Sequence, residues 1–247
     1  MKQNHEVVLY GILLFLFLAP VVNSAESLPV ITLNDTNDPP YRTLNNDGFV
    51  DVVLLEIFKR IGYQVKTVSL PAERGLLNAN EGIVDGEVNR IKGIDREYTN
   101  LRRVKERLRD SDFCVLSKNA DIVNTPEVLK TQVVGYIKGW KIYDKMMSGA
   151  KNTVTANNTQ QLFRLLKIGR IDVVLYTCAQ GFYLAKKYGI ENVVELTPKL
   201  KQRGMYIYLN KKHENLLPAL SNALQSVKRE GLYEAWYEEK IMPHLHQ

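Results

Sequence analysis

The stretch NEGIVDGEV, Asn80 to Val88, has a close counterpart later in the chain, KIGRIDVVLYT, Lys167 to Thr177. Each contains a glycine, two further residues, an aspartate and then residues that favour β-strands, and each follows a leucine-rich segment with helical spacing. Glycine permits the positive φ of a helix end, and an aspartate there can accept hydrogen bonds from backbone amides. We therefore expect two similar α/β units, with Asp85 and Asp172 in structural roles rather than in ligand contact.

The composition is that of an ordinary globular protein. The chain has 247 residues, of which 45% are hydrophobic and 24% charged, enough for one large or two small domains. The formal net charge is +6 and the sequence pI about 9.1. The basic residues alternate with acids, as in REYTNLRRVKERLRD, so the charge indicates a solvated surface and no nucleic-acid partner.

The N-terminus resembles an export signal. A short basic segment, MKQNH, precedes the uncharged run VVLYGILLFLFLAPVV, and Val22 and Ser24 satisfy the small-residue rule for cleavage after Ser24. We expect a signal peptide over residues 1–24 and a soluble periplasmic protein. An uncleaved membrane anchor is the alternative, because the run is nearly long enough to span a bilayer.

The first half of the mature chain alternates strand and helix patterns. Strands are expected at 28–35, 64–70 and 84–88, and helices at 49–63 and 71–82, where apolar residues recur at helical spacing. Strands separated by helices pair in parallel through right-handed crossovers, which predicts an α/β fold.

The second half begins the same alternation again. Its expected elements are strands at 112–118, 131–137, 152–156, 170–177, 193–198 and 203–212, and helical segments at 125–130, 138–150, 158–169, 179–190 and 214–241, the last of which is expected to form two helices with Gly231 between them. Cys114 and Cys178 each lie in or beside an expected strand. They could pair in an oxidising compartment, or remain as free buried cysteines.

The order of these motifs resembles the extracellular solute-binding proteins of family 3, the type II periplasmic binding proteins that serve amino-acid ABC transporters. The resemblance rests on PPY after the first strand, on GFVDVVLLEIFKRIGYQV, GIVDGEV and GRIDVVL, and on the C-terminal ALQSVKREGLYEAWYEE. It covers residues 27–240. Each motif alone is weak, but their order and spacing together are fairly specific.

The resemblance implies two lobes joined by two crossing hinge strands, with a ligand held between them. The chain is expected to leave lobe 1 near residues 105–112 and to return near 200–206. Residues 25–107 and 204–247 would form lobe 1, and residues 108–203 lobe 2. Helix N-termini and strand ends facing the cleft can hold an anion there.

The resemblance and the residue chemistry give five candidate ligand contacts in lobe 1. Tyr41 follows the first strand, where the family places an aromatic residue against the ligand, although it could pack beneath the prolines instead. Arg90 follows the third strand, where a guanidinium can grip a carboxylate. Arg96 is its rival in KGIDREY, and either could be an ordinary solvated arginine. Glu73 and Arg74 begin a helix near the cleft, and Arg74 could instead pair with a nearby carboxylate.

Lobe 2 supplies three candidates. Trp140 stands where many relatives have hydroxyl residues, and its indole could stack on a ligand or pack in the core. Tyr176 and Thr177 end an expected strand and could hydrogen-bond a ligand. Relatives that bind amino acids have an acid at the position of Thr177, to pair with the ligand ammonium. Thr177 cannot form that ion pair, which argues against an ordinary α-amino acid.

The leading hypothesis is therefore a monomeric, non-enzymatic solute-binding protein that captures a small polar, carboxylate-bearing molecule for an inner-membrane ABC permease or a sensor receptor. A periplasmic enzyme on the same scaffold, similar to cyclohexadienyl dehydratase, is the alternative, with Glu73 or Glu87 as general acid. A stand-alone sensory domain is a third. We expect no catalytic residues, cofactor or metal, since the four histidines form no ligand cluster in the sequence.

Overall fold

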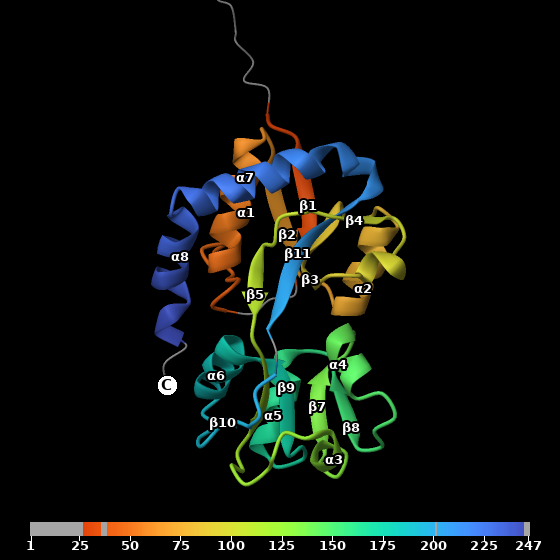
Figure 1. The fold of residues 1–247 in the computed structure, drawn as a ribbon, viewed down its shortest axis with the longest axis vertical. Helices are drawn as coiled ribbons and strands as arrows, with labels where there is room; N and C mark the ends of the chain where they lie inside the picture. The colour runs from red at the N-terminus through yellow and green to blue at the C-terminus, as the bar shows by residue number, and fades with distance from the viewer. Residues whose placement is uncertain (1–26, 36–38, 201, 245–247) are drawn as a thin grey trace, which may run out of the picture.

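The computed structural model describes residues 27–35, 39–200 and 202–244, so the expected signal peptide lies outside the described residues. The described chain forms two lobes, each a β-sheet with helices on both faces (Figure 1). This is the predicted α/β class in a two-lobed arrangement. None of the helices in the described part is long and apolar enough to cross a membrane.

Lobe 1 is built on a six-stranded sheet with the order β2-β1-β3-β11-β4, in which β5 also pairs with β11. Its strands are β1 (Val30–Asn34), β2 (Gln64–Val68), β3 (Gly86–Ile91), β4 (Leu101–Arg103), β5 (Arg109–Ser111) and β11 (Arg203–Asn210). The first three strands run parallel and β11 runs antiparallel to its neighbours. The predicted parallel crossovers are confirmed.

Helices cover both faces of the lobe 1 sheet. They are α1 (Phe49–Arg60), α2 (Ala72–Asn80), α7 (Leu217–Arg229) and α8 (Leu232–Lys240), with the short 3-10 helices η1 (Ile94–Arg96), η2 (Lys211–Leu216) and η3 (Met242–His244). The apolar face of α1 is buried in one core together with residues of α7. A smaller core on the other face packs beneath α2. Helix α2 therefore covers the face of the sheet opposite to α1 and α7.

Lobe 2 is built on a five-stranded sheet with the order β10-β6-β9-β7-β8. Its strands are β6 (Phe113–Ser117), β7 (Val134–Ile137), β8 (Thr153–Ala156), β9 (Val173–Thr177) and β10 (Val194–Glu195), and its helices are α3 (Pro126–Leu129), α4 (Lys141–Met146), α5 (Thr159–Lys167) and α6 (Cys178–Lys187). The strongly amphipathic α5 buries Leu162, Phe163 and Leu166 against the sheet.

The two aspartates of the repeated motif have the same role. Asp85 Oδ2 accepts a hydrogen bond from the backbone N–H of Thr32 at 2.8 Å, and Asp172 Oδ2 accepts one from the N–H of Val133 at 2.8 Å. Gly82 and Gly169, three residues earlier, have φ of 76° and 69°. Each aspartate thus ties the start of its strand to a neighbouring segment. The predicted structural role is confirmed.

The chain crosses between the lobes within one residue. Strand β5 ends at Ser111 in the lobe 1 sheet, β6 begins at Phe113 in the lobe 2 sheet, and Asp112 lies between them. The return runs from β10 to β11. The boundary between lobe 1 and lobe 2 at residues 107 and 108 remains a prediction. The hydrogen-bonded sheet of lobe 1 continues past it through β5, a strand that the sequence pattern did not predict.

A disulfide bond lies next to this crossing. Cys114 in β6 and Cys178 at the start of α6 are bonded, with their Cα atoms 5.1 Å apart. Of the two states that the sequence left open, the structure has the paired one. Because Cys178 directly follows Thr177, the bond secures the end of β9 to the hinge-side strand of lobe 2.

Candidate ligand-binding site

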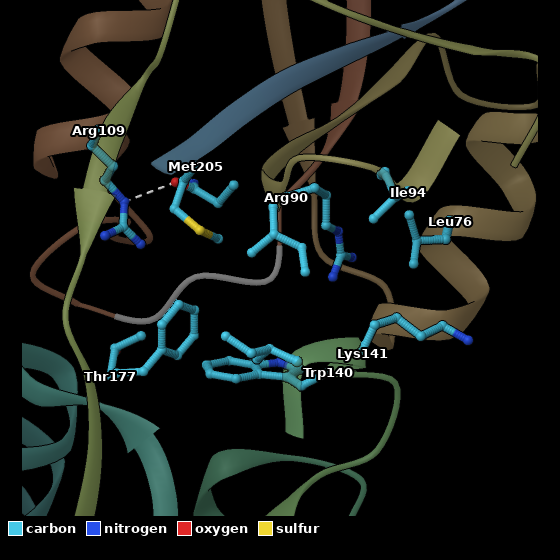
Figure 2. Close-up of a pocket in the computed structure, with 12 residues that line it drawn as sticks. Leu76, Arg90, Ile94, Arg109, Trp140, Lys141, Thr177 and Met205 are labelled. Carbon is cyan, nitrogen blue, oxygen red and sulfur yellow. Dashed lines mark hydrogen bonds between the residues drawn. The ribbon is translucent and has the colours of Figure 1, made fainter. Parts of the chain in front are cut away.

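A cavity lies between the lobes and is lined by residues of both (Figure 2). We call it the interlobe cavity. Its lining combines three cationic residues, two neutral polar residues and an apolar remainder: Arg90, Arg109 and Lys141; Asn89 and Thr177; and Leu76, Ile91, Ile94, Phe113, Trp140, Ile142 and Met205. None of the described residues that line it is acidic.

Arg109 enters the cavity from β5 and is 2% exposed. Its Nε donates a hydrogen bond to Asn89 Oδ1 at 2.8 Å, and its Nη1 donates to the backbone oxygen of Asp110 at 3.2 Å. The guanidinium carbon lies 3.9 Å from the ring centroid of Tyr41, a cation–π contact. Figure 2 shows the guanidinium directed into the cavity.

Sequence reasoning missed Arg109. The signal that could have found it is its position, because it falls in the segment 105–112 where the chain was expected to cross between the lobes. Of the cations in that segment, Arg109 lines the cavity, whereas Arg107 is exposed and paired with Asp110.

Asn89 links Arg109 to a buried carboxylate. Its backbone has φ of 60°, the left-handed region that asparagine tolerates better than most residues. Its Nδ2 lies 3.4 and 3.5 Å from the two carboxylate oxygens of Asp35, which is fully buried at the end of β1. The amide thus uses its oxygen toward the arginine and its nitrogen toward the aspartate, and holds both groups in one orientation.

Arg90 enters the cavity from β3. Its Nη2 lies 3.1 Å from Glu87 Oε2 and donates to the backbone oxygen of Ala72 at 3.2 Å. Glu87 is fully buried behind it and accepts a further hydrogen bond from Asn34 Nδ2 at 2.8 Å. Burial raises the pKa of Glu87 to about 7, although Arg90 and Asn34 oppose the increase.

Gly75 in α2 is required for this arrangement. A Cβ placed on Gly75 would collide with the side chains of both Asn34 and Glu87. The glycine therefore lets α2 lie directly over the buried pair, and α2 in turn brings the carbonyl of Ala72 to Arg90.

Lobe 2 contributes an aromatic wall. The indole of Trp140 stacks on the ring of Tyr176 with centroids 4.7 Å apart, and lies nearly parallel to Tyr143 at 5.8 Å. Tyr176 and Tyr143 are fully buried and Trp140 is half-buried, so Trp140 is the ring of this stack that faces the cavity. Thr177 also lines the cavity, and its hydroxyl is hydrogen-bonded to Gln180.

The lobes touch at one rim of the cavity. Lys141 of lobe 2 pairs with Glu73 Oε2 at 3.1 Å and with Glu97 Oε1 at 3.2 Å, both in lobe 1. Tyr98 donates to Glu73 Oε1 at 3.0 Å, and burial together with this bond raises the pKa of Tyr98 to about 12. Gly139 lies so close that an added Cβ would be 2.8 Å from the backbone nitrogen of Glu73. The two lobes are thus in direct contact at this rim.

The predicted contacts fall into three groups. Arg90, Trp140 and Thr177 line the interlobe cavity. Tyr41 and Tyr176 lie directly behind it, supporting Arg109 and Trp140, and Glu73 lies on the rim. Arg74 and Arg96 are exposed and outside the lining. Contact of any of these with a ligand stays a prediction.

A second cavity between the lobes shares Trp140 with the first. It is lined by Ser69–Ala72 of lobe 1 and by Ile137, Asn157–Thr159 and Tyr176 of lobe 2. Its described lining carries no charged side chain. Room for the uncharged part of a ligand thus exists beside the cationic cavity.

No family model matches the chain. A protein of Shewanella oneidensis, described only as uncharacterised, is 22% identical over 244 residues, which cover 90% of this chain and 86% of that protein.

Solved structures match the fold closely. ArgBP from T. maritima, crystallised as a mutant, has a TM-score of 0.74 at 20% identity, covering 85% of this chain and 94% of its own. A histidine kinase sensor domain with similarity to periplasmic binding proteins has a TM-score of 0.76 at 15% identity, and the match covers 87% of this chain and 96% of the sensor domain. The solute receptor for L-cysteine of Neisseria gonorrhoeae has a TM-score of 0.73 at 19% identity, and the match covers 88% of this chain and 92% of the receptor chain.

This chain has the periplasmic-binding-protein fold. The predicted fold class is confirmed, and the resemblance of the motifs to solute-binding proteins is matched by the resemblance of the whole fold.

Proposed function

We propose that the protein is a solute-binding protein that captures a small carboxylate-bearing molecule between its lobes and presents it to a membrane partner. The observation that carries the proposal is the placement of Arg90 and Arg109 in the interlobe cavity, facing Trp140 and Thr177 of the other lobe. A ligand that contacts both lobes stabilises the closed state by its differential affinity for that state.

The chemistry of the cavity supports an anionic ligand. Two guanidiniums offer several N–H donors in a planar geometry that suits a carboxylate, and the surrounding apolar walls exclude water and strengthen such contacts. Structures of the same fold are described as binding arginine, glutamate or L-cysteine, which are themselves carboxylates.

The membrane partner is proposed by analogy alone. One structural neighbour is the substrate-binding protein of an amino acid ABC transporter, and another is the sensor domain of a histidine kinase. We propose an inner-membrane ABC permease or a sensor receptor as the partner of a monomeric protein, and the periplasm as the compartment. The paired cysteines are consistent with an oxidising compartment.

A binding role is favoured over the enzymatic alternative. Glu87, one candidate general acid, is fully buried behind Arg90, and Glu73, the other, is engaged by Lys141 and Tyr98 on the rim. The described structure thus brings no carboxylate to the cavity surface where a general acid would meet substrate.

Fluorescence titration tests this function directly. The chain has two tryptophans, and Trp236→Phe leaves Trp140 in the cavity as the only reporter. We expect saturable changes with at least one member of a panel of organic acids and amino acids. In Arg109→Gln the affinity should fall about 10- to 100-fold, as for the loss of a charged hydrogen bond. Arg164→Gln, on the exposed face of α5, should bind normally. No response to any member of the panel would contradict the proposal.

A further inference from the structure

The interlobe cavity has a cation toward each end and an apolar middle. Figure 2 shows Arg109 and Thr177 at one side of the cavity, Arg90 and Lys141 toward the other, and Met205 between them. The two arginines come from different strands, β5 and β3, which flank β11 on opposite sides. The two arginines therefore reach the cavity from different strands and not from a single cationic point.

Each arginine is fixed from behind by a different buried partner. Arg109 is held by Asn89, and Arg90 by Glu87 and the carbonyl of Ala72. Because these supports lie on the protein side, the guanidiniums keep their orientation without a ligand. Two such preorganised groups can each receive a carboxylate with little loss of side-chain entropy.

The two described carboxylates linked to these arginines through Asn89 or directly lie beneath the surface. Glu87 and Asp35 are fully buried, and Asn89 lies between Asp35 and Arg109. A ligand entering the cavity would meet the guanidiniums before Glu87 or Asp35. A ligand ammonium would meet no described carboxylate on the cavity surface and would lose its hydration without an ion pair, which is costly.

The third cation does not add a further anion site. Lys141 is paired with Glu73 and Glu97 on the rim, and Figure 2 shows its amine directed away from Arg109. The rest of the lining is largely apolar, with Ile91 and Met205 from lobe 1 and Phe113 and Trp140 from lobe 2.

From this geometry we infer that the cavity selects a dicarboxylate with an apolar body and without an ammonium group. One carboxylate would bind at Arg109 and Thr177, and the other at Arg90. The inference rests on the proposed solute-binding function and names the chemical class of the ligand.

Matched ligands test the inference by calorimetry on the purified protein. Succinate, glutarate, adipate and phthalate are each compared with the corresponding monoamide, which lacks one negative charge. Succinate is also compared with L-aspartate, and glutarate with L-glutamate, because each amino acid differs from its diacid only by an added ammonium group. We expect at least one diacid to bind at least tenfold more tightly than its monoamide, and at least tenfold more tightly than the amino analogue where one exists. Arg90→Gln and Arg109→Gln should each abolish the advantage over the monoamide, whereas the exposed control Arg164→Gln should retain it.

The possible outcomes distinguish failure of the dicarboxylate inference from failure of the proposed solute-binding function. If an amino acid or a monocarboxylate binds and no diacid binds more tightly, the dicarboxylate inference is overturned and the solute-binding function stands. If a diacid binds but both arginine variants keep its advantage, the two-ended site is likewise overturned. If no acid and no amino acid of the panel binds, both proposals fail.

Discussion

Arg109 donates a hydrogen bond of 2.8 Å to Asn89 across β11, the strand that lies between their own two strands. The bond joins the crossing strand of the hinge to the central strand of lobe 1, and it fixes a guanidinium in the cleft. Asn89 can do this because its backbone has φ of 60°, which turns its amide away from the regular path of β3.

The first prediction separates the backbone role of Asn89 from its side-chain role. Asn89→Gly tolerates the positive φ, whereas Asn89→Ala does not, so the alanine variant should have the lower free energy of unfolding by about 1 kcal/mol. Both variants lose the bond to Arg109 and should weaken ligand binding by about tenfold. Urea denaturation and calorimetry measure the two effects. Equal stability of the variants would show that the backbone conformation carries no cost.

The second prediction concerns closure of the lobes. In Gly139→Ala the new Cβ would meet the backbone of Glu73 at 2.8 Å, so we expect the lobes to separate, with a larger radius of gyration and weaker ligand binding. Gly149→Ala is the matched control, because Gly149 has nearly the same φ, 81° against 84°, and no atom within 4 Å of the added Cβ. Both variants should lose about 1 kcal/mol of stability from the positive φ. Small-angle scattering measures the radius of gyration of each variant. A Gly139→Ala variant with the radius of gyration of the wild type would contradict the prediction that the lobes separate.

The third prediction concerns the pH dependence of stability. The pKa of Glu87 is raised from 4.5 to about 7, chiefly by burial, so between these values the folded protein binds more protons than the unfolded chain. Stability should therefore fall as pH rises through this window, by about 3 kcal/mol in total from this group, and stay lower above pH 7. Arg90, Asn34 and Asp35 are the groups that face Glu87 and modify its pKa.

Glu87→Gln isolates that contribution. The variant cannot titrate at position 87, so its free energy of unfolding should change less between pH 4.5 and pH 7.5 than that of the wild type. Denaturant unfolding across this range gives the comparison. Parallel curves for the two proteins would mean that Glu87 titrates near its ordinary pKa.

The fourth prediction concerns the disulfide. The bond closes a loop between residues 64 apart in sequence, and in the chain-entropy account a loop of this length stabilises the fold by roughly 4 kcal/mol. Cys114→Ser with Cys178→Ser should lower the free energy of unfolding by an amount of this order. Addition of a reductant should lower the wild-type value and leave the double variant unchanged. An unchanged wild type in reductant, with the thiols shown to be free, would contradict the prediction.

Much of the fold was predictable because its signals are local. The apolar spacing in α1 and α5, and the glycine that ends each helix, depend on residues within a few turns of one another. The motif of Asp85 and Asp172 could be predicted to bind backbone amides for the same reason. Strand β5 was missed because three residues carry no readable period, and it pairs with a strand about 95 positions later in the chain.

The candidate site was predicted only in part. Trp140, Thr177 and Arg90 lie where the order of strands placed them, at the cleft. Arg96 and Arg74 were also candidates from the sequence but are exposed outside the interlobe cavity. An arginine on a loop or helix start has several directions open to it, and local sequence does not select among them.

The amino-acid sequence determined the alternation of strands and helices and the two α/β units, because both follow from periodicity and turn chemistry over short distances. The segment where the chain crosses between the lobes was expected from the resemblance of the motifs. Only the tertiary structure decided that Arg109 belongs to the site, that Asn89 and Glu87 hold the two arginines, and that the cysteines pair. The physical reason is that these contacts join residues whose proximity is set by the packing of whole sheets, and a buried charge acquires its role from the groups that such packing places around it.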